Sequence, residues 1–271
     1  MKKAKVYFIG AGPGDPELLT IKAKKIIEKS DIIIYAGSLV NKKVLNFVKS
    51  GAKIYNSARM NLEQITKIIK DAYVANKTVA RLHTGDPSIY GAIQEQMDFC
   101  QKYGIGYEVI PGVSSFCAAA ASLKQELTLP DVSQTVILTR ISGRTKVPKK
   151  EDLERLAKIR ATLIIFLSID RIEEIVNKLL SGYSKNTPAA IIYRTSWPDE
   201  KIISGTLSDI ASKVKKAGIK KQALIFVGEV LSKEGFKKSV LYDKTFSHSF
   251  RKATNHLRTP GVRKVKIRRI R

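Results

Sequence analysis

The chain opens with a strand, a glycine-rich turn and a helix, and this arrangement restricts its fold more than any other feature. The β-branched and aromatic run Lys5–Ile9 predicts a buried strand, and Pro16–Lys29 has apolar residues at helical spacing. The sequence GAGPGD, residues 10–15, lies between them. A strand that turns tightly into a helix is typical of parallel sheets covered by helices.

The same alternation continues along the chain. Further strands are expected at Asp31–Tyr35, Lys53–Tyr55, Thr78–Leu82, Tyr107–Ile110, Thr135–Thr139, Ala161–Leu167, Ala189–Tyr193 and Gln222–Val227. Further helices are expected at Leu62–Ala75, Tyr90–Tyr103, within Pro111–Leu123, and at Lys150–Lys158, Ile172–Ser181 and Leu207–Ala217. We therefore predict two α/β domains, residues 1–112 and 113–252, followed by a basic tail, residues 253–271.

The composition favours a globular enzyme. With 271 residues and 44% hydrophobic content, the chain is long enough for two modest cores. No apolar run approaches the roughly 18 residues of a membrane span, and the N-terminus enters a strand without a signal sequence, so we expect a cytoplasmic protein. Cys100 and Cys117 lie apart from each other and from any histidine cluster. We expect two buried thiols and neither a disulfide nor a protein metal site.

The net charge of +25 is concentrated near the C-terminus. From Ser232 onward, 13 Lys and Arg oppose only Glu234 and Asp243. We expect the tail to be disordered or to bind an acidic partner. The charge of the remaining chain fits a ligand with many carboxylates or phosphates. A basic nucleic-acid-binding protein is an alternative that predicts salt-sensitive binding, but it leaves the glycine-rich turns unexplained.

The first glycine-rich turn differs from a dinucleotide-binding fingerprint. Asp15 occupies the position of the third glycine, where a carboxylate would repel a pyrophosphate. Pro13 also removes a backbone donor of the kind that holds phosphate. The pattern predicts a rigid turn beside a ligand without phosphate. Alternatively, it is a plain structural turn in which Asp15 caps the following helix.

The sequence HTGDPSIYG, residues 83–91, forms a second turn at the end of a predicted strand. Because the carboxyl ends of parallel strands meet at one edge of a sheet, both turns can face one cleft. Gly85 permits close backbone approach, and Asp86 offers a carboxylate to a ribose, an amine or a sulfonium. Alternatively, Asp86 accepts hydrogen bonds from neighbouring amides. His83 is interpreted as a structural histidine rather than a proton carrier.

Together, GAGPGDPELLT, HTGDPSIYGA and PGVSS resemble the tetrapyrrole methylases. Four later stretches resemble the branch that methylates carbon 11 of precorrin-4 or cobalt-precorrin-4 in cobalamin biosynthesis: residues 129–148, 164–170, 193–202 and 218–231. The resemblance covers about residues 4–252 and excludes the basic tail. Alternatives within the family are enzymes that methylate another precorrin carbon, diphthamide or ribosomal RNA. A further alternative is a protein that binds S-adenosylmethionine, the family's methyl donor, but does not catalyse methyl transfer.

The resemblance implies a class III methyltransferase fold, with a ligand cleft between two α/β domains, and a homodimer. It implies that S-adenosylmethionine, the methyl donor, binds in this cleft at Pro13, Gly85, Asp86, Ile89, Ser115, Leu167, Tyr193 and Ala223. For a macrocycle with many carboxylate arms, the candidate contacts are Arg140, Arg144, Tyr35 and Ser38, with Arg59, Arg81 and Arg194 as further candidates. We expect no catalytic dyad and no protein-bound metal, since any cobalt would arrive inside the substrate.

Overall fold

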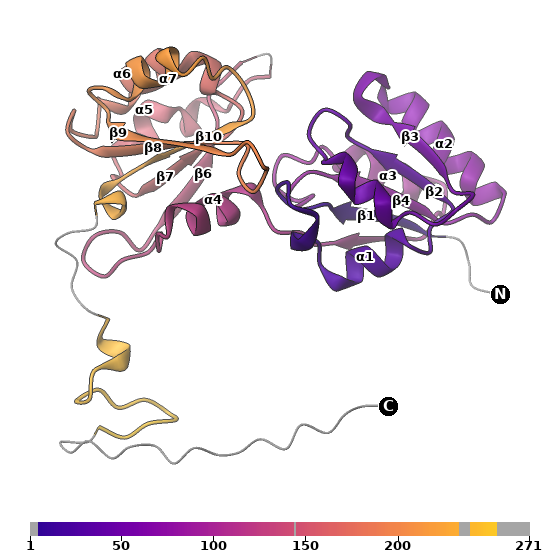
Figure 1. The fold of residues 1–271 in the computed structure, drawn as a ribbon, viewed down its shortest axis with the longest axis horizontal. Helices are drawn as coiled ribbons and strands as arrows, with labels where there is room; N and C mark the ends of the chain where they lie inside the picture. The colour runs from indigo at the N-terminus through magenta and orange to yellow at the C-terminus, as the bar shows by residue number, and fades with distance from the viewer. Residues whose placement is uncertain (1–4, 144, 233–238, 254–271) are drawn as a thin grey trace.

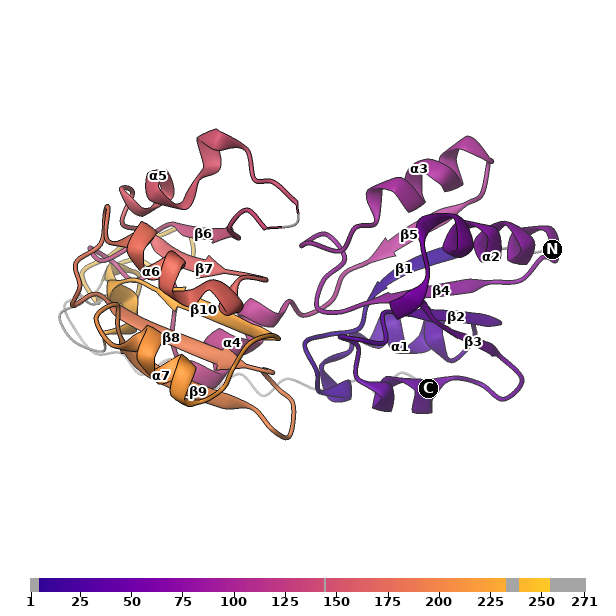
Figure 2. The same cartoon turned by 90° about the horizontal axis from the view of Figure 1, so that it is seen from above.

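The computed structural model describes residues 5–143, 145–232 and 239–253. These residues form two lobes, each built on a five-stranded sheet (Figures 1 and 2). The N-terminal lobe carries the first sheet, and the C-terminal lobe carries the second. The expected α/β architecture is confirmed. The predicted basic tail lies outside the described residues, except for Ala253.

All strands of the first sheet are parallel, as expected. In the order β3-β2-β4-β1-β5, their bounds are Lys53–Asn56, Ile32–Tyr35, Val79–His83, Val6–Gly10 and Tyr107–Ile110. The lobe also contains α1 (Ile21–Ile27), α2 (Leu62–Val74), α3 (Gln94–Lys102), η1 (Pro16–Leu18), η2 (Lys42–Phe47) and η3 (Ser57–Arg59). One face of the sheet packs against α2 and α3, and the other packs against α1 and η2.

The second sheet is mixed. In the order β6-β7-β10-β8-β9, its strands are Val136–Thr139, Thr162–Ile165, Ala223–Val227, Pro188–Tyr193 and Lys201–Thr206. Strands β6 and β7 are parallel, and the other pairs are antiparallel. Its helices are α4 (Ser115–Leu123), α5 (Leu153–Ala157), α6 (Ile172–Leu179) and α7 (Ile210–Lys216), with η4 (Lys149–Glu151), η5 (Ile169–Arg171) and η6 (Glu229–Leu231). A further short helix, η7 (Val240–Tyr242), lies in the segment 239–253, which stands apart from the second sheet in Figure 1. Helix α4 covers one face, and α5, α6 and α7 cover the other.

Three details differ from the sequence prediction. The helix expected at Pro16–Lys29 is divided, because the Asp15 carboxylate caps η1 and the Thr20 hydroxyl caps α1. The helix expected from Tyr90 begins only at Gln94, because Tyr90 and Ala92 have left-handed backbones, with φ of 56° and 48°. Strand β9 was not expected, since this edge strand is largely exposed and lacks a clear apolar alternation.

The two cysteines are free but differ in burial. Cys100 lies on α3 and is buried in the core, where burial raises the pKa of its thiol to about 11. Cys117 is exposed on α4, so the expectation that it is buried was wrong. The small residues around it let α4 lie close to the sheet through its other face, which carries Ala119. None of the described helices is long and apolar enough to cross a membrane.

Candidate functional site

The two glycine-rich turns lie side by side at the carboxyl edge of the first sheet. The Gly85 amide donates a hydrogen bond to the Gly12 carbonyl at 2.8 Å, and the Gly12 amide donates to the Gly85 carbonyl at 3.3 Å. A Cβ on Gly10 would lie only 2.6 Å from backbone atoms of Gly112 and Gly85. Three chain segments therefore meet with no space for side chains between them.

Asp86 ties these segments together. Its carboxylate accepts hydrogen bonds from the amide of Ser88 at 2.8 Å and from the amide of Gly112 at 2.9 Å. Burial acts to raise the pKa of Asp86, but the hydrogen bonds from Ser88 and Gly112 outweigh it and hold the pKa below its ordinary value. The interpretation of Asp86 as an acceptor for neighbouring amides is confirmed.

A cavity of about 800 Å³ lies between the lobes, bordered by these turns on one side and by the second sheet on the other. It contains most of the residues predicted for the cofactor and the acceptor. Those that line it are Pro13, Ser38, Gly85, Asp86, Ile89, Ser115, Arg140, Leu167 and Ala223. A volume of this size is typical of sites for cofactors and other small molecules.

Two predicted residues are placed differently, and a third is not described. Tyr35 ends β2 with only 7% of its surface exposed and packs in the core beneath α1. Tyr193 ends β8, where it pairs with Ala223, but its ring packs against the core under α6 and α7. Arg144 lies outside the described residues, although its neighbours Gly143 and Thr145 line the cavity.

Residues with left-handed backbones gather on the cavity wall. Tyr90, Leu167, Arg194 and Gln222 line it with φ between 47° and 56°. Such conformations are costly for residues with a Cβ, and they concentrate at functional sites. Leu167 follows β7 and leaves 66% of its surface exposed beside the cavity. These loops present side chains and backbone groups that a regular strand end would direct elsewhere.

A loop of the C-terminal lobe contacts the first glycine-rich turn directly. The Trp197 indole nitrogen donates to the Pro13 carbonyl at 3.0 Å, and the Asp15 amide donates to the Ser196 hydroxyl at 3.0 Å. The Arg194 guanidinium lies 4.0 Å from the centre of the Trp197 ring. Sequence reasoning missed Trp197, although it is the single tryptophan of the chain.

The cavity wall is strongly cationic. Its acidic residues among those described are Asp86 and Asp170. Its cationic residues are Arg81, Arg140, Arg171, Arg194, Lys220 and Lys221. Of the predicted arginines, Arg140 lies just after β6 and donates to the carbonyls of its own loop, at Thr145 and Lys146. Arg59 is exposed and lies outside the cavity.

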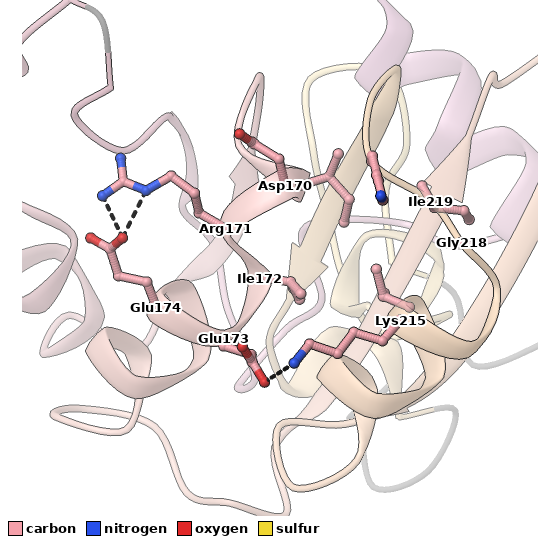
Figure 3. A pocket seen from close by; sticks show the side chains of 11 residues that line it. Asp170, Arg171, Ile172, Glu173, Glu174, Lys215, Gly218 and Ile219 are labelled. Carbon is pink, nitrogen blue, oxygen red and sulfur yellow. Dashed lines mark hydrogen bonds and ion pairs between the residues drawn. The ribbon is translucent and has the colours of Figure 1, made fainter.

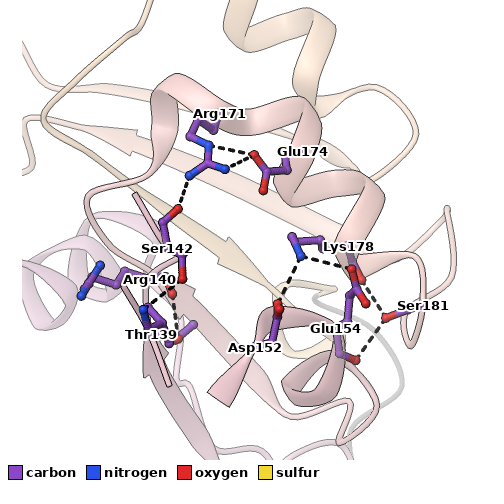
Figure 4. A network of polar contacts seen from close by, with 10 residues as sticks. Thr139, Arg140, Ser142, Asp152, Glu154, Arg171, Glu174, Lys178 and Ser181 are labelled. Carbon is purple, nitrogen blue, oxygen red and sulfur yellow. Dashed lines mark hydrogen bonds and ion pairs between the residues drawn. The ribbon is translucent and has the colours of Figure 1, made fainter. Parts of the chain in front are cut away.

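Ion pairs hold the outer rim of the second lobe. Arg171 pairs with Glu174 and donates to the Ser142 carbonyl, while Lys178 reaches Asp152 and Glu154 (Figure 4). These contacts join the loop after β6 and helix α5 to helix α6. They are largely exposed pairs, which contribute little to stability one by one.

A smaller cavity of about 410 Å³ adjoins the first and lies between the start of α6 and the end of α7. Lys215 and Glu173 form an ion pair beside it (Figure 3). None of the residues predicted for the cofactor or the acceptor lines this smaller cavity. The larger cavity is therefore the candidate site.

His83 is the last residue of β4 and lines the larger cavity with 4% of its surface exposed. Burial, and next the charge of Arg81, lower its pKa from 6.5 to about 3. This lowered pKa favours the neutral imidazole at physiological pH. Among the described residues, no group of three or more His, Cys, Asp or Glu could hold a metal ion.

Comparison with known proteins gives a consistent result. The family model of the tetrapyrrole (corrin/porphyrin) methylases matches residues 5–211. A cobalt-precorrin-4 C(11)-methyltransferase of Methanocaldococcus jannaschii is 60% identical over 250 residues, which cover 92% of this chain and 96% of that protein.

Solved structures match both lobes. The X-ray structure of a cobalt precorrin-4 methyltransferase superposes with a TM-score of 0.82 at 44% identity, covering 84% of this chain and 96% of that one. A uroporphyrin-III C-methyltransferase from Thermus thermophilus, complexed with S-adenosyl homocysteine, gives 0.71 at 30% identity, covering 84% and 94%. The chain therefore belongs to the tetrapyrrole methylase family.

Proposed function

We propose that the chain is an S-adenosylmethionine-dependent C-methyltransferase that methylates carbon 11 of cobalt-precorrin-4, or of precorrin-4, in cobalamin biosynthesis. The cationic wall of the cavity between the lobes carries this proposal, because it suits an acceptor with many carboxylate arms. The name of the relative that is 60% identical supports the choice of acceptor and of carbon. We place the cobalt-bearing acceptor first for the same reason.

We assign the cofactor to those residues of the family pattern that line the cavity: Pro13, Gly85, Asp86, Ile89, Ser115, Leu167 and Ala223. Gly85 fits this role because it lines the cavity with a φ of 62°, and a Cβ there would meet backbone atoms of Ser114 and Ser115 at 3.5 Å. Ile89, Leu167 and Ala223 add apolar surface. The complex of a neighbour with S-adenosyl homocysteine supports the assignment. When bound, the cofactor supplies an electrophilic methyl group on a sulfonium.

The contribution of the chain is mainly to position the reactants. An electron-rich ring carbon of the acceptor is the nucleophile, so little acid–base assistance is required. His83 stays neutral, and the Asp86 carboxylate is already engaged by the amides of Ser88 and Gly112. Alignment of two reactants can supply roughly 7–11 kcal/mol of the barrier. We therefore assign no catalytic residue.

Calorimetric titration with S-adenosylmethionine and S-adenosylhomocysteine tests the cofactor assignment. We expect one site per chain and at least tenfold weaker binding in Gly85→Val. Gly104→Val is the matched control, because Gly104 has nearly the same φ of 63°, open space around it and no place in the cavity. No binding to the folded wild-type protein would overturn the cofactor assignment.

Incubation with S-adenosylmethionine and cobalt-precorrin-4 or precorrin-4 tests the acceptor. Mass spectrometry should show the gain of one methyl group, and NMR should place it on carbon 11. Cofactor binding without methyl transfer to either acceptor would reject this function and favour another acceptor.

We also propose that the enzyme is cytoplasmic, forms a homodimer and holds no protein-bound metal. Within each chain, we place the boundary between the two domains at about residues 112 and 113. Light scattering of the full chain tests the dimer: a mass of one chain at micromolar concentration would reject it. Metal analysis of the purified, active protein tests the proposed absence of a protein-bound metal. Stoichiometric metal in protein free of acceptor would contradict that proposal.

A further inference from the structure

One face of strand β4 changes from apolar to polar as it approaches the cavity. Val79, Arg81 and His83 share this face, since side chains alternate along a strand. In the sheet register, Arg81 lies between Phe8 of β1 and Ile34 of β2, both fully buried. Two polar side chains thus occupy a face that is otherwise apolar.

Arg81 is a buried cation without an acidic partner among the described residues. Only 6% of its surface is exposed, and burial alone lowers its pKa, to about 10, so the guanidinium remains charged at neutral pH. Its Nε donates to Gln96 at 3.2 Å, and its Nη1 makes two long contacts of 3.4 Å with backbone carbonyls. In the described part of the chain, Nη2 has no acceptor, and Arg81 lines the cavity.

His83 provides an independent observation. Its Nε2 is buried and has no hydrogen-bond partner in the described structure. A buried polar atom without a partner loses the free energy of its hydration, so such atoms are rare unless a ligand or water completes them. A buried acceptor without a partner and a guanidinium nitrogen without an acceptor in the described structure, two residues apart on one face of β4, therefore border the same cavity.

We propose that Arg81, on the face of β4 that also carries His83, forms a buried subsite that receives one carboxylate arm of the acceptor. Arg81 Nη2 donates to a carboxylate oxygen. The unpartnered His83 Nε2, which is an acceptor in the neutral ring, takes an O–H from a water molecule beside the arm, because an ionised carboxylate has no proton to donate. The inference rests on the proposed function and deepens it. A macrocycle with several similar arms could enter the cavity in several rotations. Burying one arm at Arg81 selects one rotation and so determines which ring carbon faces the methyl donor.

The test compares Arg81→Met with Arg59→Met, a matched change at an exposed arginine outside the cavity. The binding probes are cobyrinic acid, a corrin with free carboxylate arms, and its methyl ester, in which every arm is neutral. We expect Arg81→Met to bind cobyrinic acid on the order of 10- to 100-fold more weakly, while Arg59→Met binds it like the wild type. The ester should not distinguish Arg81→Met from the wild type.

Thermal unfolding without ligand separates this role from a structural one. Removal of an unpaired buried charge should raise the melting temperature of Arg81→Met, on the order of 2–4 °C. Unchanged affinity for cobyrinic acid would overturn the subsite while leaving the proposed function intact. A lower melting temperature together with weaker binding would overturn it too, because Arg81 would then be a structural residue.

If cobyrinic acid is not bound, the KM for cobalt-precorrin-4 in the methyl-transfer assay takes its place. A higher KM and methylation at more than one carbon in Arg81→Met support the subsite. An unchanged KM and a single product overturn it. Absence of turnover in the wild-type protein rejects the proposed function itself, which distinguishes the two failures.

Discussion

The two walls of the cavity are built by opposite means. On the N-terminal side, Gly10, Gly85 and Gly112 bring three backbones into contact with no side chain between them. On the C-terminal side, Leu167, Arg194 and Gln222 carry full side chains on left-handed backbones. The first wall depends on glycines, which have no Cβ, so that the backbones can approach closely. The second wall depends on left-handed backbone conformations that the surrounding structure must impose. Substitutions should therefore change stability in opposite directions on the two walls.

The largest effect is expected at Gly10. In Gly10→Ala, the new Cβ would lie 2.6 Å from backbone atoms of Gly112 and Gly85, which cannot move independently of the sheet. We expect a loss of about 3 kcal/mol in the free energy of unfolding, measured by denaturant titration. Gly106→Ala is the control, because its Cβ would meet only Lys5 at 3.7 Å. Equal stability of the two variants would contradict this account of the first wall.

The pH dependence of stability tests the burial of His83. Its pKa falls from 6.5 to about 3 on folding, so between these values the unfolded chain binds a proton that the folded chain does not. Stability should therefore decrease as the pH falls below 6.5, by about 1.4 kcal/mol per pH unit from this residue. The slope between pH 6 and 4.5 should be shallower by this amount in His83→Gln. An identical slope in both proteins would show that His83 is protonated in the fold.

The contact between the walls should have a smaller effect. Trp197→Phe keeps an aromatic ring but removes the donor that bonds the Pro13 carbonyl at 3.0 Å. We expect a loss of about 1 kcal/mol in unfolding free energy. We also expect weaker binding of S-adenosylmethionine by calorimetry, because Pro13 borders the cavity. Unchanged values for both quantities would mean that the two walls are positioned independently of this bond.

The smallest effect, with the opposite sign, is expected at Leu167. Leu167→Gly relieves the steric strain of a residue with a Cβ at a left-handed φ of 53°, and it removes a largely exposed side chain. We expect a gain of less than about 1 kcal/mol in unfolding free energy, together with a several-fold loss of cofactor affinity. Leu180→Gly is the control at an ordinary helical φ of −63°, where the same change should destabilise. Destabilisation of similar size in both variants would remove the distinction between the walls.

The difference between the walls also explains how much the sequence could predict. The first wall was foreseen, because glycines at strand ends are visible in a sequence and parallel strands bring their carboxyl ends together. The second wall was reached only through family resemblance, at Leu167, Ala223, Arg140 and Arg194. No local sequence pattern predicts the left-handed backbone of Arg194 or Gln222, because tertiary contacts impose that conformation.

Strand direction and side-chain burial were hidden for related reasons. A fully buried strand such as β10 has the same apolar pattern whether its neighbours run parallel or antiparallel, so the mixed order of the second sheet was not predicted. Arg81 was one of several possible arginines in the sequence. Its burial without an acidic partner, which distinguishes it from the exposed Arg59, depends on packing by Phe8 and Ile34 from neighbouring strands.

The meeting of Gly10, Gly85 and Gly112 also has a consequence for the kinetics of folding. These residues are far apart in the sequence, so bringing them together closes long loops and costs chain entropy. The hydrogen bonds that offset this cost form only when β1, β4 and β5 are paired. Locally formed elements such as α2 can form earlier. We therefore expect the proposed cofactor site to form late in folding, so that newly made chains become competent to bind only after the first sheet is complete.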